Sequence, residues 1–353
     1  MKRQNILKCL TASIIALSLL AACATSPPAT PAAPAAPAAP AAAAPAGEAD
    51  DANNVADVNW PTRPIQVVVP FLPGGDTDMY ARMFAPFLEE ELGQTVTVVN
   101  IDGASGTVGA TQVSMAAPDG YTVLFYHTGN MFTNVLLGTT DLNHHNFAVS
   151  NVAMHCDANI LVAGADTGIT SAEQFIEMAR ENPGSLSTAT TITGFSFLLV
   201  RKMEIAGDFR TNPVDAGGAG AMAAMLLGGH TDVAIGNLAL FQQYVENGDM
   251  VALTIFSEER NASLPDVPTV VELGLEEAVV GRSYFFGFPM GTDEAILRRL
   301  SDAVGNITSN PEFEQVVFDA VSMPTFFVPT EGAMAHLDEM WDQVDGFDVY
   351  LLQ

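Results

Sequence analysis

Residues 67–78, with the sequence VVVPFLPGGDTD, have the residue types and spacing of an anion-binding turn. The run Val67–Val69 predicts a buried strand, Gly74–Gly75 predicts a turn, and Asp76–Asp78 can cap a helix over residues 79–92. The N-terminus of a helix carries backbone N–H groups without partners and the positive end of the helix dipole, so a carboxylate can bind there. A tight strand–turn–helix connection without any ligand explains the same stretch, and taken alone the stretch favours that simpler interpretation.

A second loop of small residues follows the next predicted strand. Residues 95–101 (TVTVVNI) predict this strand, and residues 102–106 (DGASG) predict a loop that opens a helix ending at Pro118. Neither this loop nor residues 71–78 contains Lys or Arg. An anion held by these two loops therefore has to be bound by backbone N–H groups and helix dipoles.

Patterns that would indicate an enzyme are weak or absent. Gly218-x-Gly220-x-x-Ala223 matches a relaxed dinucleotide-binding fingerprint, with Asp232 further on, but it lies in a run of Gly, Ala and Met where chance matches are common. The sequence has no Gly-x-Ser-x-Gly nucleophile elbow, and Cys156 has no adjacent basic residue to activate its thiol. We therefore expect no catalytic residue and no cofactor.

The histidines do not predict a metal site. The six of them, at positions 127, 144, 145, 155, 230 and 336, show no metal-ligand spacing. His144 and His145 could not face one ion from a strand, and we expect them in a loop. We therefore expect no metal.

Length and charge narrow the class of protein. A chain of 353 residues exceeds the usual size of one hydrophobic core, so two lobes are expected. The chain has 13 Lys and Arg against 41 Asp and Glu, a net charge of −28. Such a charge argues against binding to nucleic acid and against adhesion to anionic lipid headgroups.

The N-terminus is predicted to be a targeting segment. Residues 1–22 contain three basic residues among the first eight, followed by an apolar stretch, residues 10–20, that is too short to span a bilayer. The segment ends in Leu20-Ala21-Ala22-Cys23, which resembles a bacterial lipobox. This resemblance implies cleavage before Cys23 and lipid on its thiol. The alternative is an ordinary secretory signal with an incidental cysteine.

Residues 23–59 are predicted to be a linker. Most of this segment is Pro/Ala-rich and favours extended polyproline II over helix. It would hold the folded body away from a membrane anchor. If Cys9 is removed with the signal and Cys23 is lipidated, Cys156 remains alone, and no internal disulfide can form.

Predicted strands and helices alternate from Trp60 onward, which indicates α/β lobes with mostly parallel sheets. Residues 139–159 show no regular pattern, and residues 285–289 predict the last strand before three helices. Two lobes of this kind form a clamp with its hinges where the chain crosses between them. We expect lobe I over residues 60–161 and 287–353, and lobe II over residues 162–286.

Seven short motifs stand in the order and spacing of one protein family. They are Pro61-x-x-Pro64-Ile65, Pro70-Phe71-x-x-Gly74-Gly75-x-x-Asp78, Leu92-Gly93-Gln94-x-Val96, Asn100-x-x-Gly103-Ala104-x-Gly106, Pro118-Asp119-Gly120-Tyr121-Thr122, Asn182-Pro183-Gly184 and Leu264-Pro265-Asp266-Val267-Pro268-Thr269. Together they resemble the extracytoplasmic solute receptors of tripartite tricarboxylate transporters, the Bug family, over about residues 60–345.

This resemblance implies a two-lobed periplasmic-binding-protein-like fold of type II, each lobe a mixed, mostly parallel sheet flanked by helices. In that family the glycine-rich loops of the first lobe and the facing loops of the second hold ligand carboxylates, largely through backbone amides and ordered water. The matched loop positions are Gly74, Gly75, Asp78, Gly103, Ala104 and Gly106. The expected site adds Phe71, Asp102, Ser105 and Thr128 from the first lobe and Gly194, Ser196, Asp215 and Gly217 from the second.

The second lobe departs from the family pattern. Members usually show a Gly-x-Gly-Ser loop followed by a histidine, whereas this chain has Thr193-Gly194-Phe195-Ser196 and then Leu199. A Tyr-Lys-Gly-like element is replaced by Asp215-Ala216-Gly217. The loss of Tyr and Lys and the gain of Asp215 put a plain dicarboxylate in doubt and favour a ligand with a hydroxyl or amine. Asp215 can equally be a helix N-cap.

The sequence thus predicts a solute-binding receptor and not an enzyme. It would capture a small organic acid and present it to the membrane permease of a tripartite tricarboxylate transporter, as an extracytoplasmic monomer anchored in the membrane only through lipid at Cys23. A signalling receptor with the same fold, which hands its closed form to a sensor protein, is the alternative. A secreted hydrolase or dehydrogenase is a third interpretation.

Overall fold

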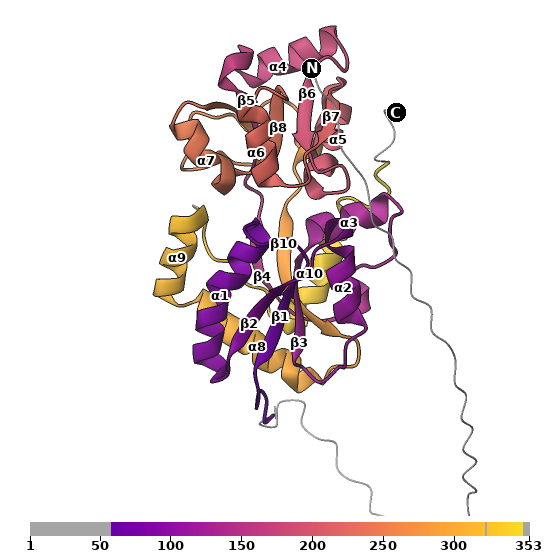
Figure 1. Ribbon diagram of the computed structural model, residues 1–353, viewed down its shortest axis with the longest axis vertical. Helices are drawn as coiled ribbons and strands as arrows, with labels where there is room; N and C mark the ends of the chain where they lie inside the picture. The colour runs from indigo at the N-terminus through magenta and orange to yellow at the C-terminus, as the bar shows by residue number, and fades with distance from the viewer. Residues whose placement is uncertain (1–57, 322, 349–353) are drawn as a thin grey trace, which may run out of the picture. The chain divides into compact units, whose positions relative to one another are not determined.

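The computed structural model describes residues 58–321 and 323–348. The predicted signal peptide, Cys23 and nearly all of the predicted linker lie outside the described residues. Two five-stranded sheets, each covered by helices, make up the described part of the chain (Figure 1).

The first sheet has the strand order β2-β1-β3-β10-β4. Its strands are β1 (Ile65–Val69), β2 (Val96–Asn100), β3 (Thr122–His127), β4 (Phe147–Cys156) and β10 (Arg282–Pro289). β1 pairs in parallel with β2 and β3, whereas β10 is antiparallel to both β3 and β4. The sheet is therefore mixed, with a parallel half and an antiparallel half.

Helices cover both faces of this sheet (Figure 1). They are α1 (Asp76–Leu92), α2 (Thr107–Ser114), α3 (Thr128–Leu136), α8 (Glu294–Thr308), α9 (Pro311–Val321) and α10 (Thr330–Asp342), with short 3-10 helices η1 (Ala104–Gly106) and η2 (His144–Asn146). Val67 and Val69 belong to the same apolar cluster as residues of α1, α8 and α9, and Val68 belongs to a second cluster with residues of α2, α3 and α10. Because successive strand residues point to opposite faces, an unbroken apolar run such as 67–69 suits a strand covered on both sides.

The second sheet repeats the same plan with the order β7-β6-β8-β5-β9. Its strands are β5 (Asn159–Gly164), β6 (Ser187–Thr190), β7 (Asn212–Asp215), β8 (Val233–Asn237) and β9 (Met250–Ile255). Its helices are α4 (Ala172–Glu181), α5 (Phe195–Gly207), α6 (Ala219–Leu227) and α7 (Leu238–Glu246), with 3-10 helices η3 (Ala165–Thr167) and η4 (Glu276–Ala278). β6 is parallel to β7 and β8, and β5 is antiparallel to β8 and β9.

The chain crosses between the sheets twice. It leaves the first sheet after β4 and enters the second at β5 two residues later, and it returns through the segment between β9 and β10. β5 belongs wholly to the second sheet and β10 wholly to the first. The lobe boundaries expected from the sequence, at 161/162 and 286/287, fall inside these two strands. We propose that the lobes are divided instead at residues 157–158 and at residues 279–281, which link η4 of the second lobe to β10.

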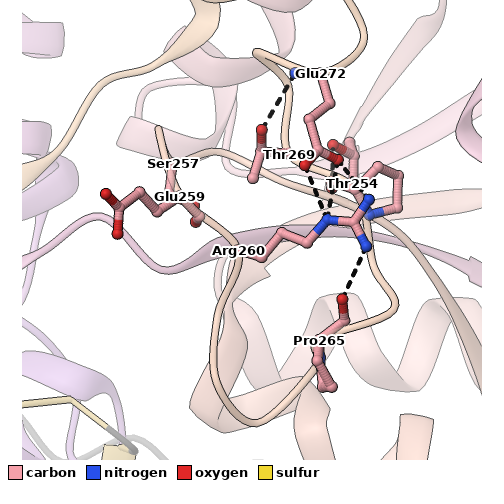
Figure 2. A network of polar contacts seen from close by, with 8 residues as sticks. Thr254, Ser257, Glu259, Arg260, Pro265, Thr269 and Glu272 are labelled. Carbon is pink, nitrogen blue, oxygen red and sulfur yellow. Dashed lines mark hydrogen bonds and ion pairs between the residues drawn. The ribbon is translucent and has the colours of Figure 1, made fainter.

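The returning crossover is braced by Arg260 (Figure 2). Its Nε and Nη2 donate to the carboxylate of Glu272, at 2.9 and 2.8 Å, and its Nη1 donates to the carbonyl of Pro265 at 2.8 Å. The amide of Glu272 donates in turn to Oγ1 of Thr269. Residues 264–269, which carry one of the family-like motifs, therefore form a connector beside β9, where the Pro268 carbonyl accepts the amide of Ile255.

Two sequence expectations about elements need correction. Residues 139–159 are not irregular, because they include η2, the whole of β4 and the first residue of β5. The sequence of β4 does not alternate between apolar and polar residues, because eight of its residues are buried and both of its faces carry mostly apolar or small side chains. Helix α1 begins at Asp76 with Gly75 as its N-cap, so Asp76 and Asp78 lie in its first turn and are not its caps.

Candidate functional site

The turns that follow the parallel strands of both sheets line one cavity of about 850 Å³. From the first sheet these turns lead into α1, η1 and α3, and from the second into α5, α6 and α7. Ligands of open α/β sheets bind at the carboxyl ends of parallel strands, and here the carboxyl ends of two sheets share one space. Each helix directs its N-terminus, with the positive end of its dipole, at that space.

The first glycine loop is fixed from within by Asp78. Its carboxylate accepts hydrogen bonds from the amide of Gly74 at 2.9 Å, from Nε of Arg82 at 3.0 Å and from Nδ2 of Asn100 at 2.9 Å. Burial alone would raise the pKa of Asp78, but these donors outweigh it and leave the pKa below its ordinary value. Asp78 is thereby committed to shaping the loop.

The second loop has four successive residues with positive φ. They are Gly103 (139°), Ala104 (46°), Ser105 (50°) and Gly106 (98°). A Cβ on Gly106 would lie 2.5 Å from the hydroxyl oxygen of Tyr126, so only glycine fits there. The Tyr126 hydroxyl donates to the Ser105 carbonyl at 2.8 Å, and Nδ2 of Asn134 donates to the same oxygen at 3.1 Å. The loop is therefore held in its strained form from behind.

A charged pair forms the floor of the cavity. Oδ2 of Asp76 lies 2.7 Å from Nη2 of Arg282 and accepts the Tyr284 hydroxyl at 3.0 Å. Arg282 is the only Lys or Arg among the described residues that line this cavity. Its Nε is buried and has no hydrogen-bond partner among the described residues. Burial would raise the pKa of Asp76, but Arg282 and the hydrogen bonds outweigh it and the pKa is lowered.

His127 stands beside this pair as a neutral ring. Burial first, and then the positive charge of Arg282, lower its pKa to about 3, against a smaller opposite effect of Asp76. Its Nδ1 accepts the amide of Asn130, and its ring stacks on Phe71 with 5.3 Å between centroids. Because the ring is neutral, Arg282 supplies the positive side-chain charge at the floor.

The two lobes touch beside the cavity at α3 and α5. Oδ1 of Asn130 accepts the backbone amide of Phe195 at 2.8 Å, and the hydroxyls of Ser105 and Thr193 lie 2.5 Å apart. A Cβ on Gly129 would lie 2.6 Å from the ring of Phe195, so this glycine permits the close approach of the two helix ends.

Most residues expected from the sequence come together at this cavity. Its lining includes Phe71, Gly74, Gly75, Asp102, Ala104, Ser105, Gly194, Ser196, Asp215 and Gly217. Asp78, Gly103, Gly106 and Thr128 do not line it. Asp78, Gly103 and Gly106 shape the loops, and Oγ1 of Thr128 accepts the amide of Ser283 behind the floor. Asp215 accepts long hydrogen bonds of 3.3 Å from the amides of Ile192 and Gly217 and remains exposed.

The structure adds lining residues that sequence reasoning missed. Among them are Asp76, Thr77, His127, Asn130, Thr193, Asn237, Tyr244 and Arg282. Arg282 lies far along the chain from both glycine loops, and the antiparallel pairing of β10 with β3 and β4 brings it beneath them. Asn130 lies three residues after the end of β3, and Asn237 is the last residue of β8. An Asn at or just after the end of a predicted strand is a usable signal.

Two mixed α/β sheets joined by two crossovers, with one cavity between the carboxyl ends of their parallel strands, define the class of two-lobed solute-binding proteins. The model of the tripartite tricarboxylate transporter family receptor, TctC, matches residues 80–327, and the chain belongs to this family. Protein BugT of Bordetella pertussis is 29% identical over 290 residues, which cover 80% of this chain and 88% of BugT. A UPF0065 protein of Cupriavidus necator is 31% identical over 271 residues, 72% of this chain and 78% of the relative.

Solved structures have the same fold. Periplasmic binding protein BugD is 26% identical with a TM-score of 0.70, covering 80% of this chain and 96% of that one. MatC from Rhodopseudomonas palustris, solved with bound malate, is 25% identical with a TM-score of 0.72, covering 82% and 99%. Rpa4515 of R. palustris, solved with adipate, is 25% identical with a TM-score of 0.74, covering 81% and 96%.

The family and the fold are those of solute-binding receptors rather than of enzymes, and the similar solved structures include periplasmic binding proteins. In residues 58–321 and 323–348, no helix has the length and apolar character needed to cross a bilayer.

Proposed function

We propose that this chain is an extracytoplasmic receptor that captures a small organic acid in the cavity between its lobes and presents it to the permease of a tripartite tricarboxylate transporter. Receptors of this class bind by closing two lobes around a ligand, which excludes water and strengthens each hydrogen bond to a carboxylate.

One observation carries the ligand class. The N-termini of helices from both sheets meet at a single cavity whose floor holds the only Lys or Arg among its described lining residues, Arg282. The backbone amides of Gly75, Asp76 and Ser196 have no hydrogen-bond acceptor among the described residues, and all three residues line the cavity. Free amides at helix N-termini are ready donors to a carboxylate.

The relatives support the same ligand class. MatC was solved with malate and Rpa4515 with adipate, and both are dicarboxylates. The lining of this cavity also has Asp102 and Asp215, both exposed and each from a different lobe. A ligand that carries a hydroxyl or amine in addition to carboxylate would fit this mixture of amide donors and acidic acceptors.

We further propose that the mature protein begins at Cys23, which carries lipid, and that residues 23–59 tether the body to the membrane. The support is the lipobox-like sequence after a short apolar stretch. The receptor would act as a monomer, because in this structure one chain supplies both walls of the cavity.

The proposed function is tested by a thermal-shift panel on the purified protein, with monocarboxylates, dicarboxylates, hydroxy acids and amino acids as candidate ligands. We expect at least one acid to raise the melting temperature and calorimetry to give one site per chain. Neutral sugars are the control, since they offer no anion to the helix N-termini. If no acid is bound while a neutral solute is, the assignment is wrong.

A further inference from the structure

A second cluster of functional side chains lies away from the cavity, where η2 meets α10. Nε2 of His144 is 2.8 Å and Nε2 of His145 is 3.1 Å from the same carboxylate oxygen, Oδ1 of Asp338. Each of the three residues offers one possible ligand atom, and these three atoms lie within 4.8 Å of one another. The adjacent histidines converge in this way because they lie in a 3-10 helix, whereas a strand would have turned them to opposite faces.

We propose that His144, His145 and Asp338 bind a divalent transition-metal ion, with Zn²⁺ as the expected type. Two imidazoles and one carboxylate are a ligand set that suits this ion and leaves a position for water.

The distances suit coordination with little rearrangement. Metal bonds of about 2.0–2.2 Å, at angles between about 90° and 110°, place neighbouring ligand atoms about 2.9–3.5 Å apart. The two nitrogen–oxygen distances of 2.8 and 3.1 Å are close to this range. Small rotations of the exposed His145 and Asp338 would bring the third pair of atoms into place, since both side chains are about half exposed.

The site has one fixed ligand and one open side. The side chain of His144 is 2% exposed, and its ring packs edge-on against Phe132, which contacts Trp341 of α10 in the same way. The side chains of His145 and Asp338 are 59% and 48% exposed, so an ion can enter and keep water ligands. The net charge of −28 draws cations toward the chain in general.

The site is not optimised for tight binding. Nδ1 of His144 is buried and has no hydrogen-bond partner among the described residues, whereas metal-bound histidines usually donate this N–H to a second group. Absence of such a partner typically weakens binding by about 10–100-fold. A bound ion would join residues that are 194 positions apart and fasten α10 to the segment before β4.

Calorimetric titration of the purified protein with ZnCl₂ in a non-chelating buffer tests the proposal. Absorption of bound Co²⁺ in the visible range reports the geometry of the ligands. We expect one saturable site per chain, with binding weakened at least about tenfold in both His145→Ala and Asp338→Asn. His230→Ala removes an exposed histidine of the second lobe and should bind like the parent.

Melting curves in EDTA establish that each variant is folded. The proposal is overturned if the parent protein shows no saturable site, which would leave the carboxylate as a hydrogen-bond bridge between two rings. It is also overturned if His145→Ala and Asp338→Asn bind Zn²⁺ as the parent does, because the ion would then lie elsewhere.

Discussion

Asp76 and Arg282 form an ion pair of 2.7 Å in which the two side chains are only 17% and 9% exposed. One partner starts α1 and the other starts β10, so the pair joins the first glycine loop to the strand that follows the second crossover. A charge at this depth is tolerated because its partner is beside it, and removal of one partner leaves the other uncompensated.

Replacement of Arg282 by Met should therefore lower the free energy of unfolding by about 3–5 kcal/mol, as is usual when a buried ion pair loses one member. The double variant Asp76→Asn/Arg282→Met should recover a large part of this loss. Urea unfolding measures both. The control is Arg260→Met, which breaks an ion pair with Glu272 and should cost much less, because water screens a pair in which both side chains are exposed. Equal losses in the two single variants would contradict the account.

Gly75→Ala should weaken binding of an acid found in the panel by about a hundredfold or more, because a side chain at the helix N-cap displaces the carboxylate from the amides. The loss of two charge-assisted hydrogen bonds at about 1.5–3 kcal/mol each gives this magnitude. The fold should persist, since Gly75 has an ordinary φ of −82° and a Cβ there would meet nothing nearer than 3.9 Å.

Gly164→Ala is the matched control for Gly75→Ala, since its φ is −64° and it does not line the cavity. Arg180→Ala, which removes an arginine distant from the cavity, should also leave affinity unchanged. Calorimetry decides between two accounts of anion binding. If Gly75→Ala binds normally while Arg282 proves essential, side-chain charge holds the ligand and the helix N-termini do not.

His127 should make the protein less stable as the pH falls below neutrality. Its pKa is about 3 in the folded protein and near 6.5 when unfolded, so between these values the unfolded chain binds more protons. The contribution of neutral His127 to the free energy of unfolding is complete above pH 6.5. This contribution is lost as the pH falls toward 3, at up to about 1.4 kcal/mol per pH unit. His127→Gln should reduce that slope in unfolding experiments from pH 7 to pH 4. Parallel slopes for parent and His127→Gln would refute the prediction.

Cys23→Ser should release the protein from membranes, because without the thiol no lipid can be attached. Fractionation of cells into soluble and membrane parts measures the change. Cys156→Ser is the control, since Cys156 is buried in the folded body and should not affect partition. Retention of Cys23→Ser in the membrane fraction would show that another feature anchors the chain.

Saturation with ligand should decrease the radius of gyration in small-angle scattering, since two crossovers permit closure of one lobe upon the other. Asn130→Ala, which removes the acceptor of the Phe195 amide between the lobes, should reduce the decrease. An unchanged radius in the parent at saturating ligand would rule out the clamp.

The sequence predicts the lobed α/β architecture because runs such as 67–69 and the turns that follow them are local signals. Arg282 is different. Its place beneath the glycine loops depends on β10 pairing between β3 and β4, and no pattern near residue 282 announces that pairing. β4 was missed for a related physical reason, since a strand buried on both faces loses the alternation that identifies strands. The shared partner of His144 and His145, Asp338, could be recognised only from the geometry of η2.

The position of β10 also determines when the first sheet can be completed during synthesis of the chain. β10 lies inside the first sheet, between β3 and β4, yet it is made after every strand of the second sheet. Until residues 282–289 have been synthesised, β3 and β4 each have an unpaired edge. Unpaired strand edges can pair with strands of other molecules. The first half of this protein therefore stays vulnerable to aggregation until residues 282–289 arrive to close the gap.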